Sequence, residues 1–313
     1  MAARLGAIPD ARTWRDAPLG PFTTIGVGGK ADILLTAASS AALAEALRVV
    51  ADAGVPWSIL GGGSNLLVAD SGFAGVVVKL DDAFHYVETP VGVGGRSMRV
   101  VAGGGLPLSR LAAHVAQAGL SGLEFACGIP GSVGGAVVMN AGAHSGSVSG
   151  VLEAVHVVGP TDSGWLQAEL LDWGYRRSGL PGDMVVTAAS FRLTRGVSAE
   201  ILEHHRTLLG VRRRTQPRAT RSFGSTFSNP PGDYAGRLLE SCGLKGVRRG
   251  GAQVSAVHAN FISNVGDATA GDVLGLMSMM RGTVRTRHEV VLDPEVRVLG
   301  GSFLWDQGAE VSD

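Results

Sequence analysis

Four stretches of the chain carry apolar residues at three- to four-residue spacing, which is typical of amphipathic helices. They cover residues 40–53, 109–118, 200–221 and 268–284. The expected N-caps are Ser39 or Ser40 for the first helix, Ser109 for the second, and Asp267 or Thr269 for the last. A glycine follows each of the first two helices and is expected to end them.

Five short apolar runs predict buried strands, because they are rich in valine and leucine and do not show helical spacing. They cover residues 57–60, 76–80, 98–102, 154–158 and 184–193. The first 20 or so residues are polar and are expected to form a loosely held lead-in. After Gly196 the pattern becomes helical and basic. We therefore predict an α+β fold with a lead-in at residues 1–20, a first domain at residues 21–195 and a second at residues 196–313.

The composition is that of a globular protein with a large core, since 45% of the 313 residues are hydrophobic and 17% are charged. The formal net charge is zero, whereas proteins that bind nucleic acid or membrane surfaces usually carry a basic excess. The chain contains no apolar run of about 18 residues and no apolar leader. Its two cysteines, Cys127 and Cys242, lack metal-site spacing. We expect a cytoplasmic protein with no metal, no nucleic-acid partner and no membrane insertion.

Glycine is the unusual residue, with 47 copies gathered in bursts at the ends of expected strands. The burst LGGGSNLLVAD, residues 60–70, offers backbone N–H groups and two polar side chains to an anion such as a pyrophosphate. It is not a Walker A loop, and Leu66 stands where the dinucleotide fingerprint needs its third glycine. A plain turn is the alternative interpretation of this burst.

A second burst, GLEFACGIPGSVGGAVVMNAGAHSG, covers residues 122–146 and is nearly free of charge. So many small residues allow a large flat ligand to lie against the backbone. Two such loops suit a dinucleotide, one for its pyrophosphate and one for its ring system. Cys127 lies in this burst and is interpreted as a small buried apolar residue, since no basic residue is near it in the sequence.

The stretch SFGSTFSNPPG, residues 222–232, raises the possibility of a nucleophilic serine. A serine nucleophile needs a base, and the stretch lacks the Gly-x-Ser-x-Gly elbow of hydrolases. His204, His205 and His258 could serve only through proximity in space that the sequence does not reveal. The nearby cluster Arg212–Arg214 is interpreted as a solvated helix face. These observations do not favour a hydrolase.

Six motifs in this order resemble the UDP-N-acetylenolpyruvoylglucosamine reductase family. They are LGGGSNLLVAD, GLEFACGIPGSVGGAVVMNAGA, YRRSGL, FGSTFSNPPGDYAGRLLESCGLKG, GGAQVSAVHANFI and LDPEVRVLG, and the similarity runs over residues 22–300. The resemblance implies an FAD-binding domain of the vanillyl-alcohol-oxidase type at residues 21–195 and a smaller α+β substrate-binding domain at residues 196–313. It also implies FAD and NADPH as cofactors, a nucleotide-sugar substrate, and a monomer or weak oligomer. The short interval before FGSTFSNP resembles the compact type of the family.

The resemblance assigns cofactor binding to both glycine bursts. In the first burst it implies Gly61, Gly62, Gly63, Ser64, Asn65 and Leu66. In the second it implies Gly128, Ile129, Pro130, Gly131, Ser132, Gly134, Gly135, Asn140 and Gly142.

The reaction that the resemblance implies is reduction of an enolpyruvyl ether to a lactyl ether, with three catalytic residues. Arg176 would stabilise the developing enolate as a fixed guanidinium, while its neighbour Arg177 is interpreted as a surface residue. Ser225 would give a proton to the carbon beside the carboxylate, which is basic enough to accept one from a hydroxyl. Glu295 would face the substrate carboxylate, which requires a protonated or proton-sharing glutamate and hence a raised pKa.

The resemblance also implies a set of substrate-binding residues, namely Tyr175, Asn229, Arg237, Lys245, Gln253 and His258. Two positions depart from the family pattern, since Ser228 and Val257 stand where lysine is common, and Arg221 or Arg237 would have to supply the missing cation. Two other functions remain open: a flavin oxidoreductase of the same fold with another substrate, and a non-catalytic nucleotide-sugar binder. The binder would be expected to lack one of the catalytic residues, and all three are present.

Overall fold

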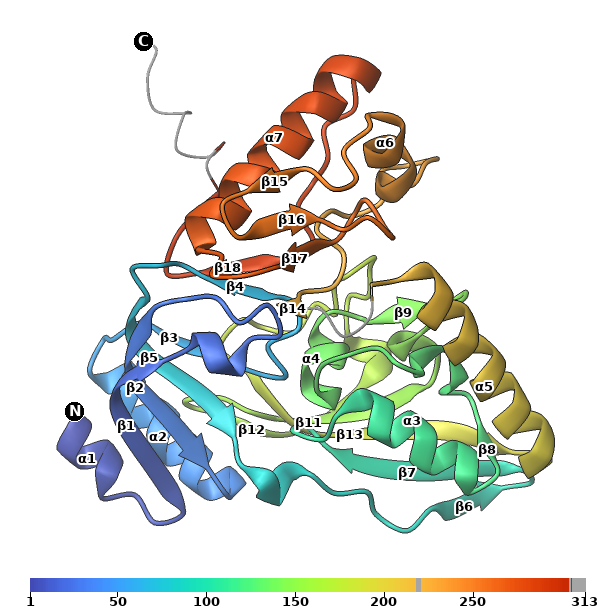
Figure 1. Cartoon of the computed structure of the whole chain (residues 1–313). Coiled ribbons are helices and arrows are strands. Elements are labelled where there is room, and N and C mark those ends of the chain that lie inside the picture. Colours follow the sequence, from blue (N-terminus) through green and yellow to red (C-terminus); the bar gives the residue numbers. More distant parts are fainter. Residues whose placement is uncertain (218–220, 304, 306–313) are drawn as a thin grey trace. The chain divides into compact units, whose positions relative to one another are not determined.

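The computed structural model describes residues 1–217, 221–303 and 305. The chain forms two compact units, each assembled from three stretches of sequence (Figure 1). Unit 1 consists of Met1–Arg15, Ile33–Gly62 and Gly75–Arg212, and unit 2 of Asp16–Asp32, Gly63–Ala74 and Arg213–Asp313. The domain bounds expected from the sequence stay a prediction. Helices and strands are mixed in both units, so the expected α+β class is confirmed.

The first sheet lies mostly in unit 1 and has four strands in the order β1-β2-β5-β3. Their bounds are β1 Ala11–Pro18, β2 Lys30–Ala37, β5 Phe73–Leu80 and β3 Trp57–Ile59. Helix α2 (Ser40–Asp52) begins after Ser39, whose Oγ accepts a hydrogen bond from the Ala42 N–H. The helix buries Leu43 and Leu47 in full. This predicted helix and its N-cap are therefore confirmed.

Two expectations about this region are wrong. Residues 57–60 do not form a buried strand: β3 lies at the edge of the sheet, and Ile59 is 36% exposed. The lead-in is not loosely held, because helix α1 (Ala2–Gly6) and strand β1 occupy it. Leu5 and Ile8 are buried and belong to the same hydrophobic cluster as Leu35. Burial of these side chains and the pairing of β1 with β2 hold a segment that is polar on average.

The second sheet of unit 1 is antiparallel, in the order β12-β11-β13-β7-β6, with β8 paired to β13. Its strands are β6 Val91–Gly94, β7 Ser97–Gly103, β8 Leu120–Ser121, β11 Leu152–Val158, β12 Ser163–Gln167 and β13 Val185–Arg195. Helices α3 (Leu108–Gln117) and α4 (Val133–Val138) contribute Leu111 and Val137 to one cluster with Val100 and Phe191 of this sheet. The three strands predicted in this part of the chain are confirmed.

Helix α3 starts earlier than expected, because Pro107 rather than Ser109 is its N-cap. The N–H of Leu108 donates to the Gly131 carbonyl oxygen at 3.0 Å. A backbone partner thus satisfies one of the N–H groups that a free helix end leaves open.

The remaining elements of unit 1 are short, apart from one long helix. They are β9 Gly142–Ala143, β10 Gly146–Ser147, α5 Ser198–Thr215, and 3₁₀ turns at Asp82–Phe84, Glu124–Ala126, Val148–Gly150 and Ala168–Leu170. The sequence predicted that the helix of α5 would extend to Arg221. It ends at Thr215, and residues 218–220 lie outside the described residues.

Unit 2 contains a four-stranded antiparallel sheet in the order β14-β17-β16-β15, and a parallel pair of β18 and β4. The bounds are β4 Leu66–Val68, β14 Arg221–Ser222, β15 Arg248–Arg249, β16 Ala252–Val254, β17 Ile262–Asn264, β18 Arg297–Leu299, α6 Ala235–Ser241, α7 Ala270–His288 and a 3₁₀ turn at Gly20–Phe22. Helix α7 begins at a capping box of Thr269 and Asp272, which confirms Thr269 of the two expected caps. Its buried face packs with Phe223 and Phe227 in one cluster.

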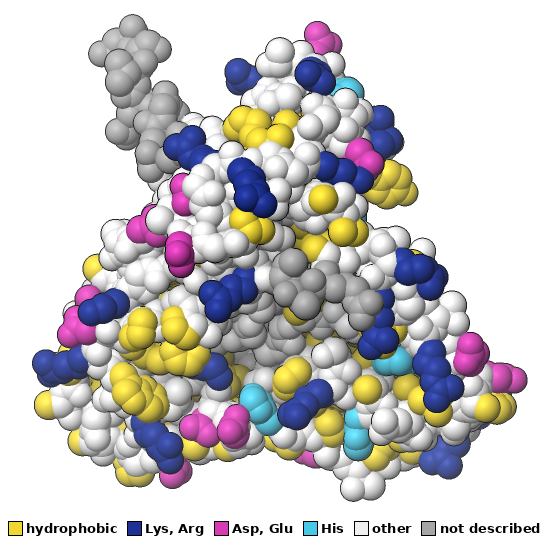
Figure 2. Space-filling model, in the orientation of Figure 1, with side chains coloured by type: hydrophobic (Ala, Val, Ile, Leu, Met, Phe, Trp, Pro, Cys, Tyr) yellow, Lys and Arg dark blue, Asp and Glu magenta, His cyan; other side chains and the backbone are white. Residues whose placement is uncertain are grey.

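Surface charges are mixed in sign. On the face shown in Figure 2, Lys and Arg side chains are scattered among acidic and uncharged ones. None of the helices among the described residues is long and apolar enough to cross a membrane.

A charged network crosses three strands of the second sheet and is centred on Glu153 of β11, whose side chain is 11% exposed. Arg99 of β7 donates to both carboxylate oxygens, at 2.5 and 2.9 Å. Arg192 and Ser190 of β13 donate as well. The hydrogen bonds from Arg99, and next those from Arg192 and Ser190, outweigh the effect of burial and lower the pKa of Glu153 to about 2.

We expect Glu153→Gln to destabilise unit 1 by about 1–2 kcal/mol at neutral pH, because Arg99 and Arg192 are half exposed and water screens them. A depressed pKa stabilises the fold above the unfolded pKa, about 4.5, and this contribution is lost as the pH falls toward about 2. Thermal unfolding of wild type and variant at several pH values checks this. The difference in unfolding free energy should shrink as the pH falls; a constant difference would contradict the ion-pair account.

Candidate active site

Two glycine loops of unit 1 meet backbone to backbone. A side-chain carbon on Gly62, which follows β3, would lie 2.5 Å from the Cα atom of Gly131. One on Gly61 would lie 2.8 Å from the Ser132 Oγ atom. Gly62 therefore has no room for a side chain, and one on Gly61 would have to displace the Ser132 hydroxyl. The structure thus brings together parts of the two bursts that the sequence assigned to one dinucleotide.

A third burst, Gly103–Gly105 at the end of β7, supports this meeting point. The Gly104 carbonyl oxygen accepts from the Gly134 N–H at 2.8 Å, in the first turn of α4. A side chain on Gly104 would lie 2.1 Å from the Val186 carbonyl oxygen. Only the fold shows that this burst packs against the second loop.

The backbone at the meeting point is open to a ligand. Gly61 and Gly62 are exposed, so their peptide groups can bind one. Ser132 is buried, and its Oγ accepts from the Gly135 N–H at 3.2 Å. These small residues without bulky side chains fit a flat dinucleotide that is recognised through peptide N–H and C=O groups.

The remaining residues of the first burst belong to unit 2. Gly63 has a φ of +62°, and a side chain there would lie 2.0 Å from the Phe22 carbonyl oxygen. The Ser64 carbonyl oxygen accepts from the Gly224 N–H at 3.1 Å. Asn65 donates from Nδ2 to the Glu295 carbonyl oxygen at 3.0 Å, and Leu66 begins β4. The side-chain amide of Asn65 thus holds the segment of Glu295 within unit 2.

Arg176 lies in a tight turn of unit 1. Its backbone has a φ of +57°, in the left-handed region that non-glycine residues rarely adopt. Residues with such a strained backbone are found preferentially at functional sites. Its guanidinium lies 4.9 Å from the centre of the Tyr175 ring, and Nη1 donates to the Gly142 carbonyl oxygen at 3.5 Å. Asn140 fixes the turn by donating from Nδ2 to the Gly174 carbonyl oxygen at 3.0 Å. The second glycine burst and the arginine turn are therefore tied together.

The neighbour of this arginine has a different setting. Arg177 pairs with Asp172 at 2.9 Å, and its side chain is 62% exposed. This agrees with its interpretation as a surface residue.

Ser225 and Glu295 lie on neighbouring backbone segments of unit 2. The Thr226 carbonyl oxygen accepts from the Glu295 N–H at 2.9 Å. An isolated bridge joins Phe227 to Pro294, and the Ser228 N–H donates to the Asp293 carbonyl oxygen at 2.9 Å. The structure thus brings two of the three expected catalytic residues together within one unit, and Arg176 belongs to the other unit.

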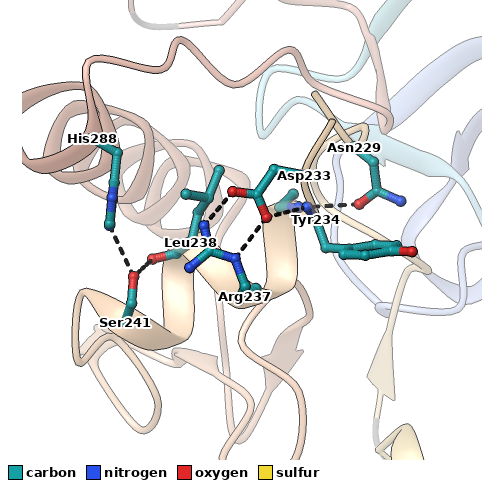
Figure 3. A network of polar contacts seen from close by, with 8 residues as sticks. Asn229, Asp233, Tyr234, Arg237, Leu238, Ser241 and His288 are labelled. Carbon is teal, nitrogen blue, oxygen red and sulfur yellow. Dashed lines mark hydrogen bonds and ion pairs between the residues drawn. The ribbon is translucent and has the colours of Figure 1, made fainter. Parts of the chain in front are cut away.

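Apart from Tyr175, which belongs to unit 1, the residues expected to bind the nucleotide sugar lie in unit 2. Figure 3 shows Arg237 pointing at Asp233, with Nε 2.7 Å from Oδ1 and a second bond to Oδ2. The hydrogen bond from Arg237 lowers the pKa of Asp233 to about 2. Asn229 is also drawn there, and its Oδ1 accepts from the Ala235 N–H at 3.1 Å. Arg237 is thus engaged by Asp233 in this structure.

The other members of this set are also engaged. Lys245 donates to Glu240 at 2.6 Å, and Gln253 donates to the Gly246 carbonyl oxygen at 3.0 Å. Burial, and next the cation of Lys245, lowers the pKa of His258. Neutral His258 accepts at Nδ1 from the Asn260 N–H at 3.2 Å. Among the described residues no histidine hydrogen-bonds to Ser225, which agrees with the argument against a nucleophile.

The departures from the family pattern lie at accessible positions. Ser228 is half-buried, and Val257 is 51% exposed. Arg221, one of the two arginines expected to supply the missing cation, lies against Gly26. A side-chain carbon added to Gly26 would lie 3.2 Å from the Arg221 Cδ atom.

One interpretation from the sequence needs correction. The cluster Arg212–Arg214 is not a uniformly solvated face, because Arg212 packs on Gly128 and is partly buried. Arg213 and Arg214 are exposed. Arg212 also lies near Cys127, which is 1% exposed, and burial raises the pKa of this thiol more than Arg212 lowers it. The interpretation of Cys127 as a buried apolar residue agrees with this.

Known proteins resemble the chain over nearly its whole length. A protein of Anaeromyxobacter sp. (strain Fw109-5) named UDP-N-acetylenolpyruvoylglucosamine reductase is 47% identical over 286 residues, 91% of this chain and 88% of that protein. This chain belongs to the UDP-N-acetylenolpyruvoylglucosamine reductase family. The relative of the same name from Myxococcus xanthus (strain DK1622) is 43% identical over 304 residues, 96% of each chain. The resemblance seen in the sequence is therefore confirmed.

Family models and a solved structure agree with this membership. The FAD binding domain matches residues 31–162, and the UDP-N-acetylenolpyruvoylglucosamine reductase C-terminal domain matches residues 216–299. The crystal structure of the family reductase from Thermus caldophilus has a TM-score of 0.78 and 37% identity, and covers 92% of this chain and 98% of its own. The predicted fold, an FAD-binding domain followed by a smaller substrate-binding domain, is confirmed.

A buried asparagine of this reductase chain was not found by sequence reasoning. Asn260 lies in the motif HANFI and is 3% exposed, and it forms hydrogen bonds to the residues after Ser225. The signal available in the sequence was a polar amide between Ala259 and the apolar pair Phe261–Ile262. Among the described residues no group of three or more histidine, cysteine or acidic side chains could hold a metal.

Proposed function

We propose that this protein reduces UDP-N-acetylglucosamine enolpyruvate, here called the enolpyruvyl sugar, to UDP-N-acetylmuramate for peptidoglycan synthesis. It uses FAD and takes its electrons from NADPH in the cytoplasm. The observation that carries the proposal is the backbone pairing of Thr226 with Glu295. It joins the segments of two expected catalytic residues, inside the region that matches the family's C-terminal domain.

The glycine loops would hold FAD through Gly61, Gly62, Gly131 and Ser132, whose close packing leaves the backbone accessible. FAD, when bound, supplies the hydride that reduces the methylene carbon of the enolpyruvyl group. The protein must then bind the sugar, stabilise the negative charge that develops toward the carboxylate, and deliver one proton.

Arg176 would stabilise the enolate. Its turn is fixed by Asn140 through Gly174, and its guanidinium lies against Tyr175, so little reorganisation is needed as charge develops. A planar guanidinium can bind a carboxylate in a fork, which an ammonium group cannot.

Ser225 would donate a proton from Oγ to the carbon next to the carboxylate. The bond that forms is carbon to hydrogen, and the serine regains its proton from water. Glu295, on the adjoining segment, would face the carboxylate. Serine is a weak acid, so the reaction depends on holding its hydroxyl at the right position.

The nucleotide sugar would be bound by Tyr175, Asn229, Arg237, Lys245, Gln253 and His258. Because Arg237 and Lys245 already pair with Asp233 and Glu240, their role would be an exchange of carboxylate for diphosphate.

The proposal is tested by NADPH oxidation with purified FAD-loaded protein. We expect oxidation beyond one equivalent of NADPH per FAD to require the enolpyruvyl sugar, and mass spectrometry to find a product two hydrogens heavier. A colourless protein that takes up no FAD, or sustained NADPH oxidation that does not depend on the enolpyruvyl sugar, would refute the proposal.

Gly62→Ala should weaken FAD binding at least about tenfold, because the new methyl group would meet the Gly131 backbone at 2.5 Å. Gly150→Ala is the matched control, since a side chain there meets nothing within 4 Å. Flavin absorbance per protein and the thermal midpoint measure both. If Gly62→Ala retains FAD as tightly as Gly150→Ala, the loop contact has no part in cofactor binding.

A further inference from the structure

Asn260 uses its backbone and its side chain to hold two consecutive peptide groups. Its carbonyl oxygen accepts from the Thr226 N–H at 2.8 Å. Its Oδ1 accepts from the Phe227 N–H at 3.0 Å, and its Nδ2 donates to the Phe227 carbonyl oxygen at 2.8 Å. The side chain thus pairs with both polar groups of Phe227 as a neighbouring strand would.

These hydrogen bonds, together with one from Gly224, anchor the backbone on both sides of Ser225. On one side of the serine, the Gly224 N–H donates to the Ser64 carbonyl oxygen at 3.1 Å. On the other side, Thr226 is fixed both by Asn260 and by the Glu295 N–H. Ser225 is therefore the residue between two anchored peptides.

The side chains of Thr226 and Phe227 do not provide this anchoring of the backbone. Thr226 Oγ1 is buried and has no hydrogen-bond partner among the described residues. Phe227 is fully buried in the hydrophobic cluster of unit 2, which fixes its ring but not its peptide direction. The direction of these peptides is set on one side by the amide of Asn260, which offers a donor and an acceptor side by side, and on the other by the bridge to Pro294.

We propose that Asn260 is the positioning residue for the proton donor Ser225, an inference that rests on the proposed function. A weak acid can act only when its hydroxyl is held against the reacting carbon, and a shift of about 1 Å can cost about 10²-fold in rate. Asn260 is buried and acts through Ser225.

A matched control lies four residues further along the chain. Asn264 at the end of β17 forms three side-chain hydrogen bonds to backbone, one more than Asn260, donating to Ile25 at 3.1 Å and accepting from Gly266 at 3.1 Å and Ala268 at 3.3 Å. It anchors segments remote in sequence from Ser225. A loss of stability alone should therefore be similar at the two asparagines.

The test compares Asn260→Asp and Asn264→Asp with wild type. The new carboxylate at residue 260 still accepts from Phe227 N–H but faces the Phe227 carbonyl oxygen without a proton to donate. We expect product formation from the enolpyruvyl sugar to slow by about 10–100-fold in Asn260→Asp, while reduction of bound FAD by NADPH stays within about twofold. Asn264→Asp should lower the thermal midpoint without this selective loss.

Two further readouts separate positioning from general weakening. Hydrogen exchange of the peptide containing residues 223–228 should accelerate in Asn260→Asp and not in Asn264→Asp. As the pH falls, the introduced carboxyl gains a proton that it can donate to the Phe227 carbonyl oxygen. The deficit in product formation relative to wild type should therefore shrink as the pH falls. Asn260→Gln, which keeps both amide groups one methylene further out, replaces Asn260→Asp if that variant does not fold, and should show the same selective slowing.

The inference is overturned if Asn260→Asp and Asn260→Gln slow both half-reactions equally, or neither, or if exchange of the segment is unchanged. These outcomes presuppose a wild type that reduces the enolpyruvyl sugar. A wild type that takes up FAD but does not reduce the sugar would instead refute the proposed function itself, and the inference with it.

Discussion

Replacing Ser225 with alanine should lower formation of the lactyl product by about 10²–10⁴-fold, the usual contribution of a positioned acid, and leave reduction of FAD by NADPH unchanged. The substitution removes one hydroxyl from a segment whose flanking peptides remain anchored to Ser64, Asn260 and Glu295. Rapid-mixing absorbance at the flavin band measures reduction and reoxidation separately.

Ser228→Ala is the matched control for this experiment. Ser228 is held through its backbone N–H by the Asp293 carbonyl oxygen, so loss of its hydroxyl leaves the segment intact. Its product formation should stay close to that of wild type. Equal loss in both variants, or loss of FAD reduction in Ser225→Ala, would remove Ser225 from the role of proton donor.

Arg176→Ala should reduce kcat by about 10²–10³-fold, because a preorganised cation at the developing enolate is lost. Alanine at this position must adopt the same φ of +57° as arginine, so comparing the variant with wild type isolates the contribution of the guanidinium. Arg176→Lys should recover only part of the rate, since an ammonium group cannot bind the carboxylate in a fork. Steady-state kinetics with saturating enolpyruvyl sugar provide the measurement.

The adjacent Arg177→Ala is the control. It removes an exposed ion pair with Asp172, an interaction that usually contributes less than about 1 kcal/mol, so its kcat should stay within about twofold of wild type. If Arg177→Ala and Arg176→Ala lost activity to the same degree, the effect would come from the turn rather than from a catalytic guanidinium.

The elements that the sequence predicted well are those whose signals are local. Helix α2 follows its N-cap Ser39, and α7 follows the capping box that begins at Thr269. Cap hydrogen bonds and apolar spacing both act within a few residues, so a linear pattern contains them. The apolar runs of β7, β11 and β13 were equally clear, because these strands are largely buried.

The predictions that failed depended on contacts remote in sequence. The N-terminus of α3 was misplaced because its Leu108 N–H is satisfied by Gly131, which is 23 positions further along. Ile59 is exposed because β3 lies at a sheet edge, and strand order cannot be read from the strand itself. The sequence predicted that Arg212 belongs to a solvated cluster, whereas in the structure Arg212 of α5 packs on Gly128.

The candidate site shows the same division. The glycine bursts indicated a close approach of backbone segments, but they did not indicate that Gly62 lies against Gly131. The family motifs named Ser225 and Glu295 separately, and only the pairing of Thr226 with Glu295 shows that their segments adjoin. Asn260 gave a weak signal, because its function lies in the two peptides it holds rather than in its own chemistry.

The central claim is that this protein transfers a hydride to the enolpyruvyl sugar and a proton from Ser225. It is tested most directly by a single turnover, in which FAD-loaded protein is reduced without oxygen, freed of NADPH and mixed with the enolpyruvyl sugar. The account predicts reoxidation of the flavin with one equivalent of UDP-N-acetylmuramate formed per FAD in wild type, and neither on the same time scale in Ser225→Ala. Flavin that stays reduced with wild type, or product formed equally fast by Ser225→Ala, would contradict it.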